Sequence, residues 1–330
     1  FLIINGDLVD TGWEEDFAFA NQVLEEEVGD AIPIYYIPGN HEIVGSGSLD
    51  NFLDVFGQNR YNFDHKGTRF ILLDSATGSF RTSDFQQLVE LKMLLEEASS
   101  DPSIHNVVVV GHHPTRDPLP TKNSQLSDRK EAELLEKWLT DFREESGGKG
   151  ALYISGHAHT VHVERVEGVP YMVTGAAGKA PYGAADDGGI YAWTLFGVDP
   201  TPVPDQANGP ENGRVKGADW IQAEVRPLLE AITLDVKTAL TVGETVTIEA
   251  TGHQSGNLDF PLRYPATVRW EGSENVFIGK GSELEQAKKS GRYAAVLNSA
   301  TSELTALSAD TITLRVISNN MAAEQQIVIQ

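Results

Sequence analysis

Cysteine is absent from the 330 residues of this chain. This absence excludes disulfide bonds, thiolate zinc sites and cysteine nucleophiles. Long apolar runs are missing too: no stretch approaches the roughly 18 apolar residues of a membrane-spanning helix, so we expect no membrane span. The chain begins with Phe1 rather than methionine. We therefore expect it to be a fragment, in which the lack of a signal peptide says little about secretion.

Positive charge is scarce. The chain has 25 Lys and Arg against 48 Asp and Glu, which gives a formal net charge of −23. Because nucleic-acid binding depends on Lys and Arg neutralising phosphates, we expect no nucleic-acid-binding patch. The negative charge of the chain also repels small phosphate esters unless bound cations change the local charge. A phosphate-binding site in this chain would therefore need metal ions.

The first two thirds of the chain alternate short apolar segments with helical patterns. The apolar segments, which we predict to be buried strands, are Leu2–Ile4, Ile34–Ile37, Phe70–Leu73, Val107–Val110 and Leu152–Ile154. Between them, apolar residues fall at helical spacing in residues 84–98 and 128–142, and Asp128 is the expected N-cap of the second helix. Alternating strands and helices predict an α/β layered domain, which we place at residues 1–230.

A segment rich in Pro and Gly occupies residues 199–217. Its composition fits either an interdomain linker or a long exposed loop. We favour a hairpin loop, because residues 220–227 resemble the returning strand of the same sheet.

The last hundred residues have a different pattern. Residues 232–252, for example, alternate Val246, Ile248 and Ala250 with polar residues. Short alternating strands without a helical period predict an all-β sandwich over residues 231–330. The stretch LTVGETVTIEATG resembles the opening of a bacterial immunoglobulin-like domain. This resemblance implies an extracellular or cell-surface location in a bacterium, and a spacer or a module that contacts the cell wall or a polysaccharide.

Four polar motifs each follow a predicted strand. They are GDLVD at residues 6–10, PGNHE at 38–42, GHHP at 111–114 and GHAHT at 156–160. Because the carboxyl ends of parallel strands meet at one edge of a sheet, we expect these motifs to converge. Imidazole and carboxylate suit Zn, Fe, Mn or Co, and an amide oxygen adds a neutral hard donor. Two adjacent ions would bind a phosphate and lower the pKa of a bridging water.

The ordered series GDLVD, GNHE, GHHP and GHAH resembles the calcineurin-like metallophosphoesterase superfamily, which includes purple acid phosphatases and bacterial phosphodiesterases. The resemblance covers about residues 1–230 and implies a four-layer αββα sandwich with a dinuclear metal centre. It implies that Asp7 bridges both ions. Asn40, His112 and His157 would complete the site of one ion, and His159 would bind the other.

The resemblance also implies roles in the reaction. His41 would contact the phosphoryl group and help to protonate the leaving oxygen, and Asp10 would hold the local geometry of its motif. A metal-bound hydroxide would attack a phosphomonoester or phosphodiester at a dinuclear centre that we expect to be incomplete in this fragment, so that the fragment alone would be a crippled or inactive enzyme. The ions would be divalent or trivalent Mn, Fe or Zn, two in the intact protein and at least one in this fragment.

One expected motif is missing. The family opens with Asp-x-His, and the 330 residues contain no such triplet. We expect a strand carrying it to precede Phe1 in the natural protein. The alternative is a catalytically degenerate scaffold that serves as a surface binding or spacer protein.

Several residues keep more than one interpretation. His113 is either a residue near the metal or substrate, or a partly buried ring. Arg116 and Lys179 follow the motif loops and read as ordinary surface charges, with phosphate contact as the less favoured alternative. Glu25–Glu27 and Glu131–Glu136 read as solvated helix faces. The GAAGK segment lacks the spacing of a phosphate-binding loop, and no G-x-S-x-G motif of a serine hydrolase occurs.

Overall fold

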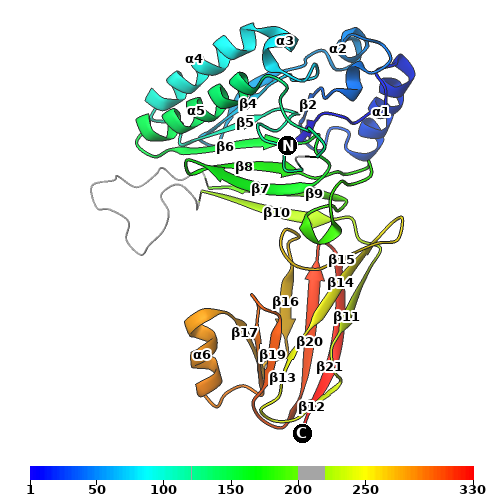
Figure 1. Ribbon diagram of the computed structural model, residues 1–330, viewed down its shortest axis with the longest axis vertical. Helices are drawn as coiled ribbons and strands as arrows, with labels where there is room; N and C mark the ends of the chain where they lie inside the picture. Colours follow the sequence, from blue (N-terminus) through cyan, green and yellow to red (C-terminus); the bar gives the residue numbers. More distant parts are fainter. Residues whose placement is uncertain (120, 200–219) are drawn as a thin grey trace. The chain divides into compact units, whose positions relative to one another are not determined.

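The computed structural model describes residues 1–119, 121–199 and 220–330, and the chain divides into two compact units (Figure 1). The first unit comprises residues 1–182 and 196–223. The second comprises residues 183–195 and 224–330. The sequence-based domain boundary between residues 230 and 231 stays a prediction.

A six-stranded sheet forms the centre of the first unit. Its strand order is β3 (Tyr61–His65), β4 (Thr68–Leu72), β5 (Asn106–Val110), β6 (Gly150–Ser155), β8 (Val169–Thr174) and β7 (Val161–Val166). The four inner strands are parallel, and the two edge strands run antiparallel to their neighbours. All five residues of β5 are buried. This continuous β-branched run is typical of a strand that is covered on both faces.

Helices cover one face of this sheet. They are α3 (Phe80–Asp84), α4 (Gln86–Ser100) and α5 (Arg129–Glu145). Leu91 of α4 and Leu139 of α5 lie in one buried cluster with Val107 and Val109 of the sheet. The helical spacing of leucines in the sequence therefore predicts both helices correctly. Asp128 caps α5, since its carboxylate accepts hydrogen bonds from the backbone N–H groups at the start of the helix.

The opposite face is covered by a second β layer. β1 (Leu2–Asn5) pairs in parallel with β2 (Ile34–Ile37), and β9 (Ala192–Val198) pairs with β10 (Ile221–Pro227). The pairing of β9 with β10 confirms the hairpin, and most of its loop lies outside the described residues.

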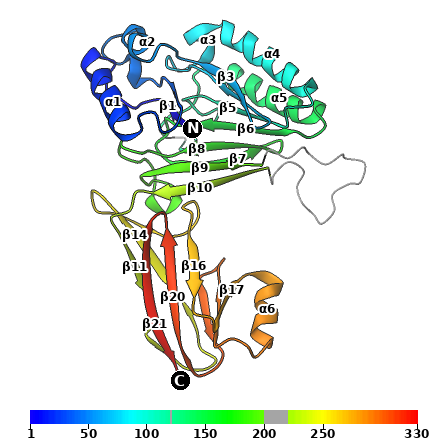
Figure 2. The same ribbon diagram turned by 180° about the vertical axis from the view of Figure 1, so that it is seen from behind.

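Alternate residues of β1 and β2 face different layers. Ile3 and Ile37 pack against the six-stranded sheet. Ile4 and Tyr36 pack against α1 (Glu14–Glu27) and α2 (Asp50–Phe56), which lie near β1 and β2 in both views (Figures 1 and 2). The layers therefore follow the predicted order α, β, β, α, and the α/β fold class is confirmed.

The expectation of a solvated helix face is wrong for Glu131 and Glu136, which are only 4% and 8% exposed. The Glu131 carboxylate accepts the N–H groups of Phe80 and Arg81, at 2.6 and 2.8 Å, at the start of α3. Glu136 binds the Arg116 guanidinium through two hydrogen bonds of 2.9 and 2.8 Å. A sequence shows the charge of a glutamate but not the donors that surround it.

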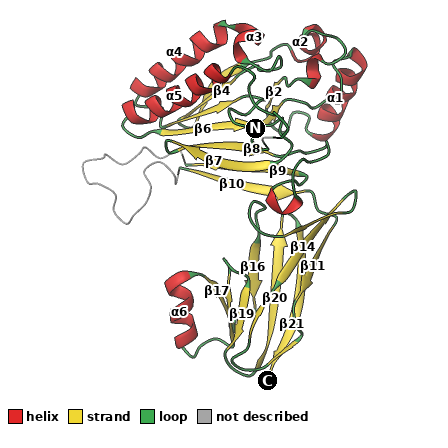
Figure 3. Cartoon of the chain, in the orientation of Figure 1, coloured by secondary structure: helices red, strands yellow, loops and turns green. Residues whose placement is uncertain are grey.

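The second unit consists mostly of strands, as predicted (Figure 3). Its first sheet has the strand order β11 (Ala231–Asp235), β14 (Glu249–Gln254), β15 (Leu258–Pro261). The second has the order β12 (Ala239–Leu240), β21 (Met321–Ile329), β20 (Asp310–Ser318), β16 (Arg269–Gly272). The third has the order β13 (Thr245–Thr247), β19 (Glu303–Ala306), β18 (Ala295–Asn298), β17 (Val276–Gly279). Alternate residues of β20, such as Ile312 and Leu314, are completely buried in its core. The immunoglobulin-like resemblance stays a prediction.

The second unit contains one α-helix, so the prediction of an all-β sandwich is wrong in this segment. α6 (Gly281–Lys289) follows β17, and only Leu284 and Ala287 of its residues are buried. Two buried positions over nine residues are too few to produce a visible helical period. Two single-turn 3₁₀ helices complete the described elements, at His41–Ile43 and Ala185–Asp187. Within the described ranges, no helix has the length and apolar character that crossing a bilayer requires.

Candidate metal centre

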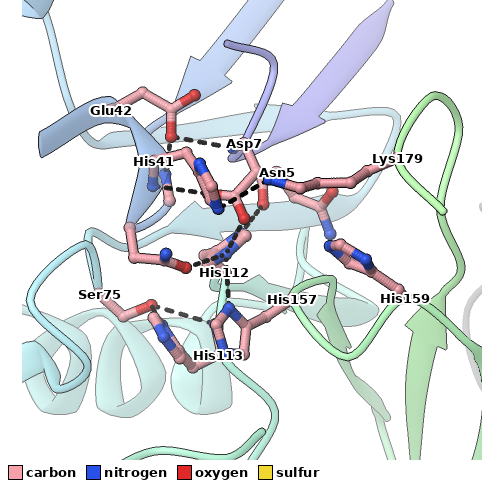
Figure 4. A network of polar contacts seen from close by, with 12 residues as sticks. Asn5, Asp7, His41, Glu42, Ser75, His112, His113, His157, His159 and Lys179 are labelled. Carbon is pink, nitrogen blue, oxygen red and sulfur yellow. Dashed lines mark hydrogen bonds and ion pairs between the residues drawn. The ribbon is translucent and has the colours of Figure 1, made fainter. Parts of the chain in front are cut away.

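The four polar motifs meet at one edge of the first unit. Asp7 follows β1, Asn40 follows β2, His112 follows β5 and His157 follows β6. Figure 4 shows Asp7, His112 and His157 pointing toward one another. The convergence that the strand pattern predicts is therefore present in the fold.

His112 lies at the centre of this group. Its Nε2 atom is 3.2 Å from Asp7 Oδ2, 3.3 Å from Asn40 Oδ1 and 3.1 Å from His157 Nδ1. Its Nδ1 atom is 2.7 Å from the carbonyl oxygen of Asn5. A carbonyl can only accept, so Nδ1 carries a proton and the neutral ring directs a lone pair from Nε2 toward the other three atoms.

The chemistry of these four atoms fits a metal ion. Carboxylate, amide oxygen and two imidazoles are suitable ligands for Mn, Fe or Zn. Ligand atoms bound about 2.1 Å from one ion lie roughly 3.0–3.5 Å from one another, as these do around His112 Nε2. Electron pairs this close repel one another unless a cation or a proton lies between them.

The directions of the pKa shifts show which of these residues holds a proton most readily when no metal is present. Burial by itself would raise the pKa of Asp7, but the charge and hydrogen bond of His112 outweigh it and lower that pKa. Burial by itself would lower the pKa of His112, but the Asp7 carboxylate raises it. Burial, followed by the charge of His112, lowers the pKa of His157 to about 4. A proton and a metal ion therefore compete for His112.

The backbone of the site is strained. Asp7, His157 and His159 have φ angles of 57°, 59° and 48°, in the left-handed region that side chains other than glycine seldom adopt. A Cβ atom on Gly39 would overlap Asp7 Oδ1 and the His112 ring, so only glycine fits at this point. Such strain is typical of functional sites, where the surrounding structure holds it in place.

Glu42 holds the turn that carries Asp7. Its fully buried carboxylate accepts the N–H groups of Asp7 and Leu8, both at 2.9 Å, that of Gly39 at 2.6 Å, and the Tyr36 hydroxyl. We did not identify Glu42 from the sequence. Its place in the GNHE motif is the signal that could have drawn attention to it.

His113 belongs to the same cluster. In the part of the chain that the structure describes, His112, His113 and His157 form a group whose ligand atoms lie within 4.8 Å of one another. The His113 ring lies 4.1 Å from that of His157, and its Nδ1 is 3.1 Å from Ser75 Oγ. Burial above all lowers its pKa to about 2, so the ring stays neutral. His113 is thus a buried ring beside the candidate ligands.

His159 lies outside this group. Its Nδ1 is 3.0 Å from the carbonyl oxygen of Ala180, and its ring stacks on that of Tyr182 with centroids 4.6 Å apart. The proton is therefore on Nδ1, which leaves Nε2 as the potential ligand atom.

His41, Asp10 and Lys179 form the rim of the site. The His41 backbone N–H donates to Asp7 Oδ1 at 2.9 Å, and its Nδ1 is 2.7 Å from the Asp10 carbonyl oxygen. The Asp10 side chain is 84% exposed, and Lys179 Nζ lies 2.8 Å from its Oδ1 and 3.1 Å from His41 Nε2. Hydrogen bonding and charge from Lys179 lower the pKa of Asp10. The predicted role of Asp10 stays a prediction.

A comparison with protein families matches residues 1–161 to the model of the calcineurin-like phosphoesterases. Residues 1–161 form a calcineurin-like phosphoesterase domain. The resemblance deduced from the motifs is thereby confirmed. The family comprises hydrolases of phosphoesters that typically use divalent metal ions.

Solved structures resemble part of the chain at low sequence identity. One is GAP50, the anchor in the inner membrane complex of Plasmodium, with 18% identity over 55% of this chain and 62% of that chain and a TM-score of 0.40. Another is the phosphopantetheinyl hydrolase of Mycobacterium tuberculosis, with 14% identity over 53% and 78% of the two chains and a TM-score of 0.36. A third is PhoD, with 10% identity over 54% and 47% and a TM-score of 0.36.

The alignment thus spans less than two thirds of the GAP50 and PhoD chains. A comparison with curated proteins finds no match.

Within the first unit, the arrangement provides two chemical functions. The inner group around His112 offers electron-pair donors to a cation, and the rim offers an imidazole and an ammonium group beside it. The inner group follows from the motifs. The position of Lys179 at the rim does not, because its partner Asp10 is 169 residues away in the chain.

Proposed function

We propose that the chain hydrolyses phosphate esters at a dinuclear metal centre on this edge of the phosphoesterase domain. The observation that carries the proposal is the convergence of Asp7, Asn40 and His157 on the Nε2 atom of His112. When bound, the ions would polarise the phosphoryl group and make water a nucleophile near neutral pH. Mn, Fe and Zn all suit this set of ligands.

The ligands divide between two ions in this proposal. Asp7, Asn40, His112 and His157 would hold one ion, and His159 Nε2 would contribute to the site of the other. Asp7 Oδ2 faces His112 and Oδ1 accepts from the His41 N–H group, so Oδ2 is the atom with which Asp7 would hold an ion.

His41 is proposed to act on the leaving group. Its Nδ1 donates to the Asp10 carbonyl, so Nε2 is the atom that faces away from the protein backbone toward Lys179. An ammonium group can only donate, so Nε2 accepts from Lys179 in this structure, and it would carry a proton to the leaving oxygen only after Lys179 has turned away from it. Asn40 and His41 together orient the phosphate oxygens.

Turnover of p-nitrophenyl phosphate and of its bis ester tests the proposal. The full-length protein is assayed with Mn²⁺, Zn²⁺ or Fe²⁺ beside an Asp7→Ala variant. Metal-dependent turnover that the variant lacks supports the enzyme. If no combination of metal and ester exceeds the variant, the proposal is wrong.

A second proposal is a degenerate scaffold that acts as a surface binding or spacer protein. This proposal would hold if the full-length protein lacks the Asp-x-His motif, which the resemblance assigns to the second ion. Metal analysis separates the proposals, because the enzyme should hold two ions in the intact protein and at least one in these 330 residues, whereas a degenerate scaffold need hold none. An extracellular or cell-surface location belongs to either proposal.

A further inference from the structure

Lys179 is held at the rim by its own loop. The loop follows β8 and is fixed to His159 by two hydrogen bonds: the Ala180 carbonyl oxygen accepts from His159 Nδ1 at 3.0 Å, and the Tyr182 N–H donates to the His159 carbonyl at 2.8 Å. The Tyr182 ring also stacks on the His159 ring. The backbone next to Lys179 is therefore anchored to a candidate metal ligand.

The ammonium group of Lys179 is weakly held. It lies 2.8 Å from Asp10 Oδ1, but the Asp10 side chain is 84% exposed and that of Lys179 is 43% exposed. Exposed ion pairs contribute little net stability, because water solvates both charges well. An anion with more charge than one carboxylate can therefore displace Asp10.

Arg116 shows the opposite arrangement. It also follows a motif loop, but two hydrogen bonds join its guanidinium to Glu136, whose side chain is only 10% exposed. Two parallel hydrogen bonds to a buried carboxylate fix an arginine firmly. Of the two cations that follow motif loops, Lys179 is thus the one available at the rim.

We propose that Lys179 is a substrate-binding residue whose ammonium group exchanges the Asp10 carboxylate for a phosphate oxygen of the substrate. The position supports this, since Lys179 Nζ lies 3.1 Å from His41 Nε2, the atom that we place beside the leaving oxygen. The inference rests on the proposed function and narrows its substrate class. Attraction to a cation grows with the charge of the anion, so Lys179 favours dianionic phosphomonoesters over monoanionic diesters.

Binding of inorganic phosphate to the Mn²⁺-loaded protein tests the contact by isothermal titration calorimetry. Lys179→Gln should weaken phosphate binding about tenfold, the effect of losing one charged hydrogen bond. Lys179→Arg, which keeps the charge, should stay within about threefold of the wild type. Lys137→Gln is the matched control, since Lys137 is an exposed lysine of α5 paired with Asp141. If Lys179→Gln binds phosphate as tightly as Lys137→Gln, the inference is overturned.

The Asp10→Asn background separates direct contact from an indirect effect through the ion pair. If Lys179 binds phosphate itself, Lys179→Gln still weakens binding about tenfold when Asp10 is already neutral. If Lys179→Gln has no further effect in that background, Lys179 acts only through Asp10 and the inference fails.

Ester preference tests the substrate class. Lys179→Gln should lower kcat/KM for p-nitrophenyl phosphate several-fold more than for the bis ester, mainly through KM. An equal or larger loss on the diester overturns the preference for dianions. If the wild type hydrolyses neither ester while Lys179→Gln still weakens phosphate binding, the proposed function fails and the phosphate contact stands.

Discussion

Each unit contains an aspartate carboxylate beside a histidine ring nitrogen, and the two pairs differ in their surroundings. In the first unit, His112 Nε2 is 3.2 Å from Asp7, and the side chains are 1% and 10% exposed. In the second unit, His253 Nδ1 is 2.7 Å from Asp259, and the side chains are 30% and 62% exposed. The pair alone therefore does not distinguish a metal site from a surface contact.

The number of electron-pair donors makes the distinction. His253 has one partner at each nitrogen: Asp259 accepts from Nδ1, and the Thr233 hydroxyl, 3.0 Å from Nε2, is able to donate. Around His112 Nε2, three atoms lie within 3.3 Å, and the oxygens of Asp7 and Asn40 can only accept. Both nitrogens of His253 therefore have a hydrogen-bond partner, whereas the atoms around His112 Nε2 need a cation or a proton between them.

Loss of Asp7 should show the difference between the two pairs most strongly, through its effect on turnover. Asp7→Ala removes the carboxylate that we place between two ions, so turnover of p-nitrophenyl phosphate should fall about a thousandfold or more. The matched variant is Asp259→Ala, which removes the aspartate of the exposed pair and should leave turnover within about twofold. Circular dichroism checks that both variants fold. Equal losses in the two variants would show that the effect is not specific to the converging donors.

Glu42→Gln should produce the next largest effect, on stability. The buried carboxylate accepts two of its four hydrogen bonds at each oxygen, and the NH₂ group that replaces one oxygen in glutamine cannot accept the two that it receives. The free energy of unfolding measured by urea denaturation should fall by about 3 kcal/mol. Glu303→Gln is the control in the second unit, where an exposed carboxylate accepts from the Thr301 hydroxyl. A loss no greater than that of the control would show that Glu42 does not hold the turn.

These residues also show how far the sequence predicts the site. His112 and His157 are predictable, because each directly follows an apolar strand and the strands are parallel. The role of Glu42 is not, because it depends on N–H groups up to 35 residues away whose direction is set by the left-handed turn at Asp7. Glu131 was misread for the same reason, since its donors lie about 50 residues earlier. Periodicity predicts which segments pair or pack, but side-chain partners between distant loops require the folded backbone.

Competition between proton and metal gives the third prediction. The Asp7 carboxylate raises the pKa of His112 above its usual value of about 6.5. In chelator-treated protein, the attraction between protonated His112 and the Asp7 carboxylate stabilises the fold fully at pH values below the pKa that His112 has in the unfolded chain. This stabilisation is lost as the pH rises through the higher pKa that His112 has in the folded protein. Metal affinity should rise about tenfold per pH unit over the same window, because the proton must leave before the ion binds.

Thermal denaturation with chelator and metal titration, both across this pH window, measure the two effects. Asp7→Asn removes the charge that raises the pKa of His112, and it should flatten the stability profile of the chelator-treated protein. An unchanged profile in Asp7→Asn would contradict the assignment of the proton to this pair.

The smallest effect is expected at the exposed pair of Asp259 and His253. A change there tests whether an exposed pair of this kind contributes to metal binding. Asp259→Asn keeps the shape of the side chain and removes its charge, so the free energy of unfolding should change by less than about 1 kcal/mol. Bound metal, measured by elemental analysis, should not change at all, because His253 already has a hydrogen-bond partner at each nitrogen. If Asp259→Asn lowered the metal content, an exposed Asp–His pair on regular strands would be sufficient to bind an ion. The convergence of electron pairs on His112 would then no longer be a reason to place the proposed metal site in the first unit.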